Sequence, residues 1–327
     1  FLVPLYTYVL TASEYGIVDL VVTVGTVAIP ILTLNISEAV MRFALDKDAD
    51  KEKITQIGTR ILLIGMLVGL LMFPVCGFFN KISQYSAYIY FYVISLAASQ
   101  LYLCDLRGKE LLIYYAIGNV LNTFFIAVLN ILFLLVLKEG IEGYLKAYII
   151  ANVLTAIYAI IAGKGYKSFY SLRIDKKLLL QMVKYSIVLI PNSFMWWIMN
   201  SSDRIMVSGM VSVAANGIYA VSYKLPTLVS TLTTIFNQAW SYSAIREEGT
   251  EDECEYNNKV FKALIGMAML IGIGLLTFAK PFLSIYVSKE YYAAWKYMPF
   301  LTVGCVYLTM ASFMATSYTV HKDSFGY

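Results

Sequence analysis

The sequence has 327 residues, of which 59% are hydrophobic and 14% are charged, with a formal net charge of +4 at pH 7. Soluble domains contain roughly 45–50% apolar and about 25% charged residues, so this composition excludes an ordinary soluble protein and favours an integral membrane protein. A single histidine, His321, excludes a histidine-based triad or a multi-histidine metal site in this chain. The four cysteines are scattered, so we expect no disulfide framework or zinc site. We also expect no cofactor, no other metal and no nucleic-acid partner.

Apolar runs long enough to cross a membrane occur along nearly the whole sequence. A hydrocarbon layer of about 30 Å requires about 20 helical residues, and charge-free runs such as 61–79 and 111–137 approach or exceed this length. The pattern predicts an all-α integral membrane protein with about ten transmembrane helices. They are expected at residues 1–11 (incomplete), 15–41, 57–79, 85–105, 110–137, 142–162, 182–209, 213–241, 259–287 and 293–319.

Both ends of the sequence run into apolar segments. The first residue is Phe1 rather than Met and lies inside an apolar run, and the last residues follow an apolar segment without a stop. We therefore expect a fragment of a longer protein, with an incomplete first helix.

The positive charges are distributed unequally between the two sets of predicted loops. One set holds 17 of the 25 lysine and arginine residues, which makes that side cytoplasmic by the positive-inside rule. The loop at Glu14 is then extracytoplasmic. The sequence predicts a multi-pass protein of a cytoplasmic membrane.

The basic segment 163–184 differs from the other connections. Ile174, Leu178, Leu179, Met182 and Val183 fall at helical spacing, which predicts either an amphipathic helix on the inner surface or an ordinary helix start with solvated charges. In both cases this segment is the expected boundary in the chain. We expect an N-terminal lobe at residues 1–162, a cytoplasmic linker at 163–181 and a C-terminal lobe at 182–327.

A shift of 201 residues places Gly16-Ile17 on Gly217-Ile218 and aligns two polar stripes. Each stripe follows steps of three and four residues, so its members share one helical face. The repeat predicts two parallel helix bundles with a substrate path between them, whereas the alternative is a pair of helix-packing faces. The stripes are Asp19, Thr23, Thr26, Pro30, Thr33 and Ser37, and Ala220, Lys224, Thr227, Thr231, Thr234 and Gln238.

Lys224, Asp203 and Arg204 are charged residues within predicted spans. Lys224 lies some 16 Å into its helix at about 1.5 Å per residue, where a charge costs roughly 2.5–3.5 kcal/mol unless it meets water, a partner or a ligand. We therefore predict that Lys224 faces a polar cavity, and that Pro226 bends the helix beside it. Asp203 and Arg204, near the outer end of their span, could line the same cavity or anchor the helix at the interface by snorkelling.

Other polar and aromatic residues have ordinary explanations. Glu38 and Arg42 are four residues apart and predict a surface ion pair. Many of the 27 tyrosines and four tryptophans fall near predicted helix ends, which favours an interfacial belt over a sugar-stacking role.

Two clusters of residues resemble a known family. They are Leu5-Tyr6-Thr7-Tyr8-Val9-Leu10 with Glu14-Tyr15-Gly16, and Lys184-Tyr185-Ser186, Ile190-Pro191 and Asn200-Ser201-Ser202-Asp203-Arg204 with Gly217-Ile218-Tyr219 and Lys224-Leu225-Pro226. Both resemble bacterial polysaccharide transport proteins, the O-antigen and capsule flippases of the multidrug/oligosaccharidyl-lipid/polysaccharide exporter superfamily. The resemblance covers nearly the whole chain, and the second cluster is its most specific part.

The resemblance implies a two-lobed exporter fold with six or more helices per lobe, here truncated at both ends. It implies alternating access that carries a lipid-linked oligosaccharide, a polyprenyl pyrophosphate sugar, from the inner to the outer leaflet of the bacterial cytoplasmic membrane. Polysaccharide polymerase machinery is an expected partner besides the lipid bilayer. The implied cavity residues are Arg204 and Lys224, with Asp203 beside them, and Asn192 is a further candidate.

Two rival functions remain open from the sequence. A cation-coupled drug or small-molecule exporter of the same superfamily would favour intramembrane carboxylates, and Asp19 is one. A membrane polymerase or ligase of lipid-linked glycans would show large outer loops with arginine or histidine, whereas the outer loops here are short. We therefore expect a transporter and not an enzyme.

Overall fold

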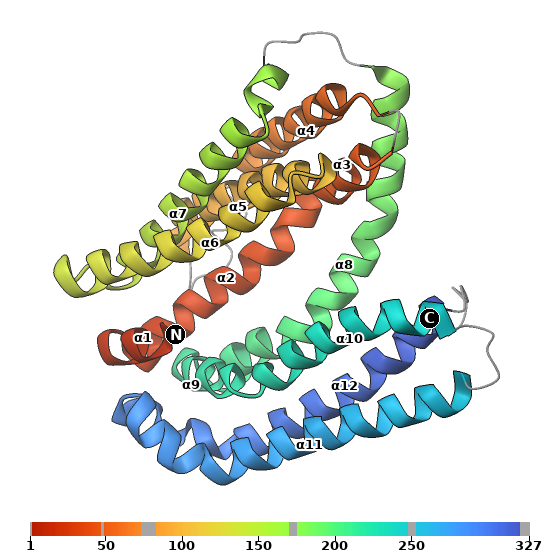
Figure 1. The fold of residues 1–327 in the computed structure, drawn as a ribbon. Coiled ribbons are helices and arrows are strands. Elements are labelled where there is room, and N and C mark those ends of the chain that lie inside the picture. The colour runs from red at the N-terminus through yellow and green to blue at the C-terminus, as the bar shows by residue number, and fades with distance from the viewer. Residues whose placement is uncertain (1, 47–48, 73–82, 170–174, 248–252, 321–327) are drawn as a thin grey trace. The chain divides into compact units, whose positions relative to one another are not determined.

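A computed structural model describes residues 2–46, 49–72, 83–169, 175–247 and 253–320 (Figure 1). Every regular element in these ranges is helical. The longer helices are α1 (Val3–Val9), α2 (Ala12–Leu32), α3 (Ile36–Ala44), α4 (Lys51–Met72), α5 (Ser86–Gly108), α6 (Leu112–Asn130), α7 (Gly140–Ala162), α8 (Lys176–Met210), α9 (Val213–Lys224), α10 (Thr227–Glu247), α11 (Glu253–Tyr286) and α12 (Met298–Val320). The short ones are η2 (Ser83–Tyr85), the π-helix η3 (Ile131–Val136), η4 (Gly165–Phe169) and η5 (Lys289–Lys296).

The helices confirm the predicted all-α membrane class. By length and composition, seven of the described helices could cross a membrane, or eight if η5 and α12, bent by 53°, count as one span. The predicted number was about ten. Part of the difference arises because the predicted span 213–241 is divided into α9 and α10, and because α1 has only seven residues.

The chain forms two compact units. The N-terminal unit contains residues 9–214, and the C-terminal unit contains residues 215–327 together with residues 3–8. The predicted boundary at 163–181 stays a prediction, although α8 groups with the N-terminal unit by its contacts. In that segment α8 begins at Lys176, where Asp175 caps the helix by accepting N–H bonds from Lys177 and Leu178. The cap favours the alternative of an ordinary helix start, and residues 170–174 lie outside the described residues.

Helices of the N-terminal unit pack closely at two glycines. In this unit α5 and α6 pack along α7, and α2 contacts both α5 and α8 (Figure 1). A Cβ atom on Gly16 would overlap the carbonyl oxygen of Val213, and one on Gly65 would overlap that of Leu32. Glycine is therefore required where these backbones meet. Gly16 belongs to the first resemblance cluster, whose Glu14 forms a capping box with Thr11 at the start of α2.

The predicted helix 15–41 is broken between α2 and α3. Leu34 and Asn35 adopt positive φ angles of 52° and 55°, a region that costs non-glycine residues of order 1–3 kcal/mol each unless the surroundings hold it. The Asn35 amide donates to the hydroxyl of Ser193 on α8 at 3.0 Å, and the Thr33 hydroxyl donates to the carbonyl of Ile29 at 2.8 Å. These bonds help to satisfy polar groups that the break would otherwise leave exposed to hydrocarbon.

A buried ion pair and its hydrogen bonds join α4, α5 and α7 at one end of these helices. Lys109 Nζ lies 2.6 Å from the Asp105 carboxylate, and the two side chains are 12% and 2% exposed. Lys109 also donates to the carbonyl of Gly163 after α7, and the Thr55 hydroxyl on α4 donates to Asp105. Because both charges are paired and hydrogen-bonded, the pair avoids the large cost of an isolated buried charge.

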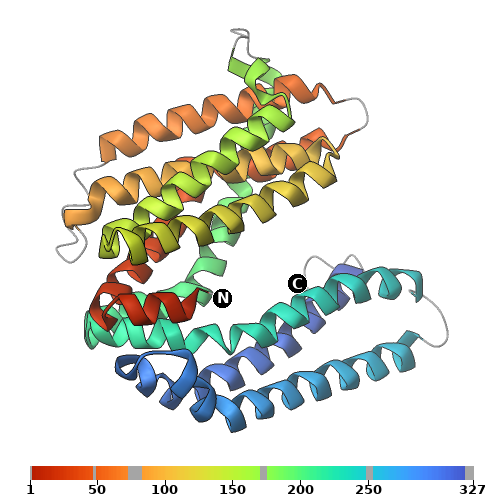
Figure 2. The same cartoon turned by 60° about the vertical axis from the view of Figure 1, so that its left-hand side comes forward.

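The C-terminal unit is a layer of helices in which α10 and α11 pack on α12 (Figures 1 and 2). One core cluster joins Trp240, Leu264 and Phe313, with the rings of Trp240 and Phe313 stacked at 4.1 Å. A second cluster joins Val229, Ala268 and Cys305.

The contact at Gly16 provides a test of the packing. We expect Gly16→Ala to destabilise the full chain by about 1–3 kcal/mol, the usual cost of overpacking, because the new methyl group displaces the backbone at Val213. Gly209→Ala on α8 is the matched control, since a Cβ there has no neighbour within 4 Å. Thermal unfolding of the purified protein in detergent measures both. Equal melting temperatures for the two variants would contradict the close approach.

Candidate functional site

The centre of the α2–α8 contact is an ion pair inside the predicted membrane region. Arg204 Nη1 lies 2.8 Å from Asp19 Oδ1, and the two side chains are 15% and 7% exposed. Asp19 lies roughly 10 Å from the start of α2, at about 1.5 Å per residue. The indole N–H of Trp197 donates to the carbonyl of Thr23 at 2.9 Å, one turn further along α2. Asp19 and Arg204 therefore lie on two helices, α2 and α8, that pack against each other.

The pair changes the expected role of both charges. The charge of Asp19 is compensated by Arg204, and that of Arg204 by Asp19, so neither is an isolated intramembrane ion. Asp203, half-buried, accepts a hydrogen bond from the backbone N–H of Arg204 at 2.9 Å. A partner on a neighbouring helix, rather than snorkelling to the interface, explains why Arg204 is tolerated at this depth.

The polar stripe of α2 is mostly buried. Thr23 and Thr33 are 1% and 6% exposed, and Thr26 is exposed. The Thr26 hydroxyl donates to the carbonyl of Thr23, while the Thr23 hydroxyl has no hydrogen-bond partner within the described ranges. Since α8 packs against Asp19 and Thr23, the helix-packing alternative accounts for this part of the stripe.

The polar stripe of α9 and α10 has different surroundings. Lys224, Thr231 and Thr234 are exposed, and Thr227 is half-buried. The side chain of Gln238 lies outside the described residues. The threonine hydroxyls donate to carbonyls one turn back, at 2.7 Å for Thr227 to Lys224 and 2.9 Å for the other two.

The opposite face of α10 makes the core contacts of the C-terminal unit. Val229 and Trp240 belong to the two core clusters, and buried Thr233 shares a hydrogen bond with Thr309 at 3.0 Å. The stripe that contains Thr231 and Thr234 is therefore not the face on which α10 packs within its own unit. The packing alternative, which explains the α2 stripe, does not explain this one.

Lys224 stands at a break in the helix. It is the last residue of α9, and α10 begins at Thr227, so the helix is interrupted at Leu225 and Pro226, where a bend was predicted. The N–H groups of Leu228 and Val229 restart the helix by donating to Leu225 and Pro226. That Lys224 faces a polar cavity, and that the two stripes line one cavity, remain predictions, as does a cavity role for the exposed Asn192.

Some polar residues were not anticipated from the sequence. The sequence contains a signal for the Asp105–Lys109 pair, because an acid and a base stand four residues apart at a helix end. The carbonyl of Gly163, which also accepts from Lys109, lies 54 residues away and has no such signal. Beside it, the Glu52 carboxylate lies 2.9 Å from Lys167 Nζ and raises the pKa of that lysine. Arg42 pairs with Asp46 at 2.7 Å, so the pairing predicted with Glu38 is replaced by one toward the helix end. Within the described ranges, no three acidic, cysteine or histidine side chains gather as a metal site.

The helices and their buried charges define an all-α multi-pass membrane protein. A solved structure of similar fold is the inward-facing conformation of a multidrug resistance MATE family transporter of the MOP superfamily. It aligns with 98% of this chain and 80% of that chain, at 14% sequence identity and a TM-score of 0.72. At that identity the likeness concerns the fold alone.

The family follows from the sequence. A profile of the family described as "Polysaccharide biosynthesis protein" matches residues 2–242. The chain therefore belongs to the polysaccharide biosynthesis protein family, as its resemblance clusters indicated. A comparison with curated proteins finds no match.

The Asp19–Arg204 pair leads to a stability prediction. Arg204→Gln leaves a buried carboxylate without its cation, which should cost about 3–5 kcal/mol. The double variant Asp19→Asn with Arg204→Gln should recover much of this loss, because it leaves no unpaired charge. Arg42→Gln is the control, since its pair with Asp46 is more than half exposed and contributes about 0–1 kcal/mol.

Thermal unfolding of the full chain in detergent compares the three variants. A double variant no more stable than Arg204→Gln alone would show that the pair does not hold α2 against α8.

Proposed function

We propose that the chain is an alternating-access transporter that moves a lipid-linked oligosaccharide from the inner to the outer leaflet during surface polysaccharide assembly. The observation that carries the proposal is the polar stripe of exposed Lys224, Thr231 and Thr234, with half-buried Thr227, in a protein of the polysaccharide biosynthesis family. These residues combine one cation with hydroxyl groups, and Thr231 and Thr234 lie off the face on which α10 packs within its unit.

The chemistry of the proposed substrate matches such a face. A polyprenyl pyrophosphate sugar has an anionic head, a glycan rich in hydroxyl groups and a long apolar tail. The ammonium of Lys224 would attract the diphosphate, and the threonine hydroxyls can accept or donate hydrogen bonds to the glycan. Translocation of this lipid breaks no covalent bond, so the proposal requires no nucleophile or general base.

The interrupted helices supply places where the chain could bend between inward- and outward-open states. The α2–α3 break at Leu34 and Asn35 and the α9–α10 break at Leu225 and Pro226 each leave a short non-helical segment within a predicted span. In such motions, a small number of residues at the ends of helices or strands commonly absorb the changes in backbone dihedral angles. We propose that both breaks serve as hinges in this way. We also propose that the protein acts in a bacterial cytoplasmic membrane, where polysaccharide polymerases use the delivered lipid.

A second candidate, a cation-coupled drug exporter, has one observation in its favour. Asp19 is a buried carboxylate in a chain with the MATE fold, and a coupling ion would need such a group. Its pairing with Arg204 at 2.8 Å makes it a less available site for a cation. We therefore place the oligosaccharide transporter first.

Replacement of Lys224 tests the proposed substrate path. In a strain that depends on this protein for surface glycan, Lys224→Gln should reduce surface glycan by roughly tenfold or more, because a charge-assisted contact of at least about 1.4 kcal/mol is lost. Lys224→Arg should retain part of the activity, since charge persists while shape changes. Lys259→Gln on α11 is the control, because this lysine is exposed and pairs with Glu255.

Glycan staining, normalised to membrane protein level, provides the measurement. Full surface glycan with Lys224→Gln would contradict the substrate role. Recovery of glycan when Asp203→Asn or Asp19→Asn is added to Lys224→Gln would instead assign Lys224 to charge balance within the protein.

A further inference from the structure

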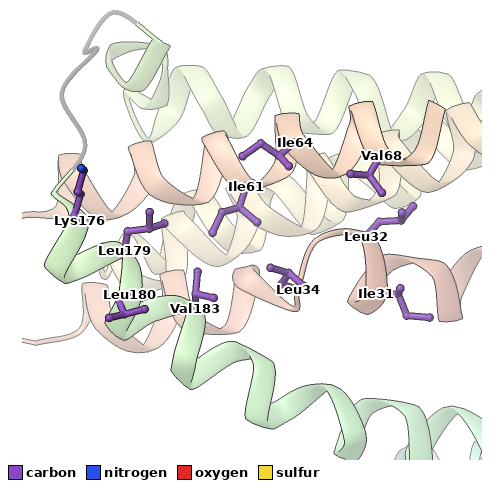
Figure 3. Close-up of a pocket in the computed structure, with 10 residues that line it drawn as sticks. All are labelled: Ile31, Leu32, Leu34, Ile61, Ile64, Val68, Lys176, Leu179, Leu180 and Val183. Atoms are coloured by element: carbon purple, nitrogen blue, oxygen red, sulfur yellow. The ribbon is translucent and has the colours of Figure 1, made fainter. Parts of the chain in front are cut away.

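An elongated apolar groove runs along the N-terminal unit between α2, α4 and α8 (Figure 3). Its volume is about 680 Å³, within the range of about 300–1,000 Å³ typical of sites for small molecules. Ile61, Ile64 and Val68 line it from α4, and Leu180 and Val183 line it from α8 (Figure 3). Every lining side chain is apolar except that of Lys176.

The groove is shaped by the broken helix. The αL conformation at Leu34 ends α2 and brings this side chain to the groove wall between α4 and α8 (Figure 3). On the other side, Gly65 lets α4 approach the carbonyl of Leu32 closely. A straight helix through residues 32–36 would not place Leu34 in this way, so the concave surface depends on a conformation with an energetic cost.

One end of the groove is positively charged. Lys176 is exposed there, and within the part of the chain that the structure describes it forms no salt bridge. The carboxylate of Asp175, beside it, caps α8 and also interacts with Lys53, which pairs with Asp50 at 3.0 Å.

The orientation places this charged end at the cytoplasmic surface. Lys176 belongs to the loop set that the positive-inside rule assigns to the cytoplasm. From there α8 continues through Leu180 and Val183 into the predicted membrane region, for roughly 10 Å at 1.5 Å per residue. An amphiphile in the inner leaflet, with an anionic head and a single aliphatic chain, matches both the charge and the direction of the groove.

We propose that this groove binds the polyprenyl tail of the lipid-linked substrate, with the diphosphate at Lys176, before the head group is translocated. The inference rests on the proposed function and identifies where the apolar part of the substrate is held. It also assigns to Lys176 a loading role separate from that of Lys224.

Burial of the tail does not by itself select this groove. Lipid tails are as apolar as leucine, so a chain gains little hydrophobic free energy by leaving the bilayer for a protein surface. Selection must come from van der Waals packing in the concavity and from attraction between the diphosphate and Lys176. Exposed residues of α6, such as Val120 and Phe124, offer neither a concavity nor this charge, so we expect them to contact all lipids alike.

Photolabelling tests the groove directly. The full chain is placed in nanodiscs of zwitterionic phospholipid with a polyprenyl diphosphate that carries a diazirine on its isoprenoid chain. Mass spectrometry should locate the label on α4 and α8 within the groove. Lys176→Ala should reduce the labelling roughly fivefold, the effect of about 1 kcal/mol from one lysine near an anionic lipid.

Two groove-filling variants and a control accompany this experiment. Ile64→Trp and Leu180→Trp should each reduce groove labelling severalfold, and Leu180 is 70% exposed, so its replacement leaves the core of the fold unchanged. Val120→Trp, on exposed α6, should leave the labelling unchanged. Excess unlabelled polyprenyl diphosphate should compete, whereas phosphatidylglycerol should not.

Equal competition by phosphatidylglycerol, or full labelling of both tryptophan variants, would overturn the inference. Full surface glycan in cells that carry both variants at normal protein level would also overturn it, while the proposed function would stand. Groove labelling as expected in a protein that supports no surface glycan would instead count against the proposed function alone.

Discussion

A hydrocarbon layer offers no hydrogen-bond partners, so each polar group that enters it must be satisfied by the protein itself. The buried ion pairs of the described residues follow this constraint, whereas the buried Thr23 hydroxyl does not. Asp19 on α2 pairs with Arg204 on α8, and Asp105 pairs with Lys109 and accepts a hydrogen bond from Thr55. Threonine hydroxyls along α2 and α10 donate hydrogen bonds to backbone carbonyls three or four residues earlier. The fold is therefore a set of apolar helices joined by a few local, compensated polar contacts.

The same constraint makes the polar face of α10 informative. The exposed Thr231 and Thr234 lie off the face on which α10 packs within its unit, because Val229, Thr233 and Trp240 form those contacts, and Lys224 is exposed at the end of α9. A lysine at this depth is costly in lipid and tolerated beside water or an anion. This face, together with the family, supports the proposal of a path for a charged and hydroxylated head group. The groove at α4 and α8 would hold the apolar remainder.

The sequence was sufficient for the elements that depend on composition and local residues. Apolar runs predicted the long helices, and the bend predicted at Pro226 marks the place where the single predicted span 213–241 divides into α9 and α10. The break at Leu34 and Asn35 has a weaker signal, since Pro30 lies inside α2 and only Asn35 is of a residue type that often adopts a positive φ. Its stability depends on distant groups such as Ser193, which local patterns do not reveal.

Contacts distant in sequence also decided the outcome for the two stripes. Their matched spacing predicted similar surroundings, yet α8 covers Asp19 and Thr23 whereas Thr231 and Thr234 remain exposed. The Asp19–Arg204 pair joins residues 185 positions apart, and no spacing rule connects them. Periodicity identifies which residues share a helical face, but only the packed neighbours determine what that face does.

Reconstituted transport tests the central claim most directly. The full chain would be placed in vesicles whose inner leaflet holds a fluorescent polyprenyl diphosphate oligosaccharide, and an impermeant glycosidase outside would report its arrival. Our account predicts cleavage that proceeds faster than in protein-free vesicles and continues until the accessible pool is consumed. Cleavage at the protein-free rate, from vesicles in which the same protein exports a cationic drug, would contradict it and favour the drug exporter.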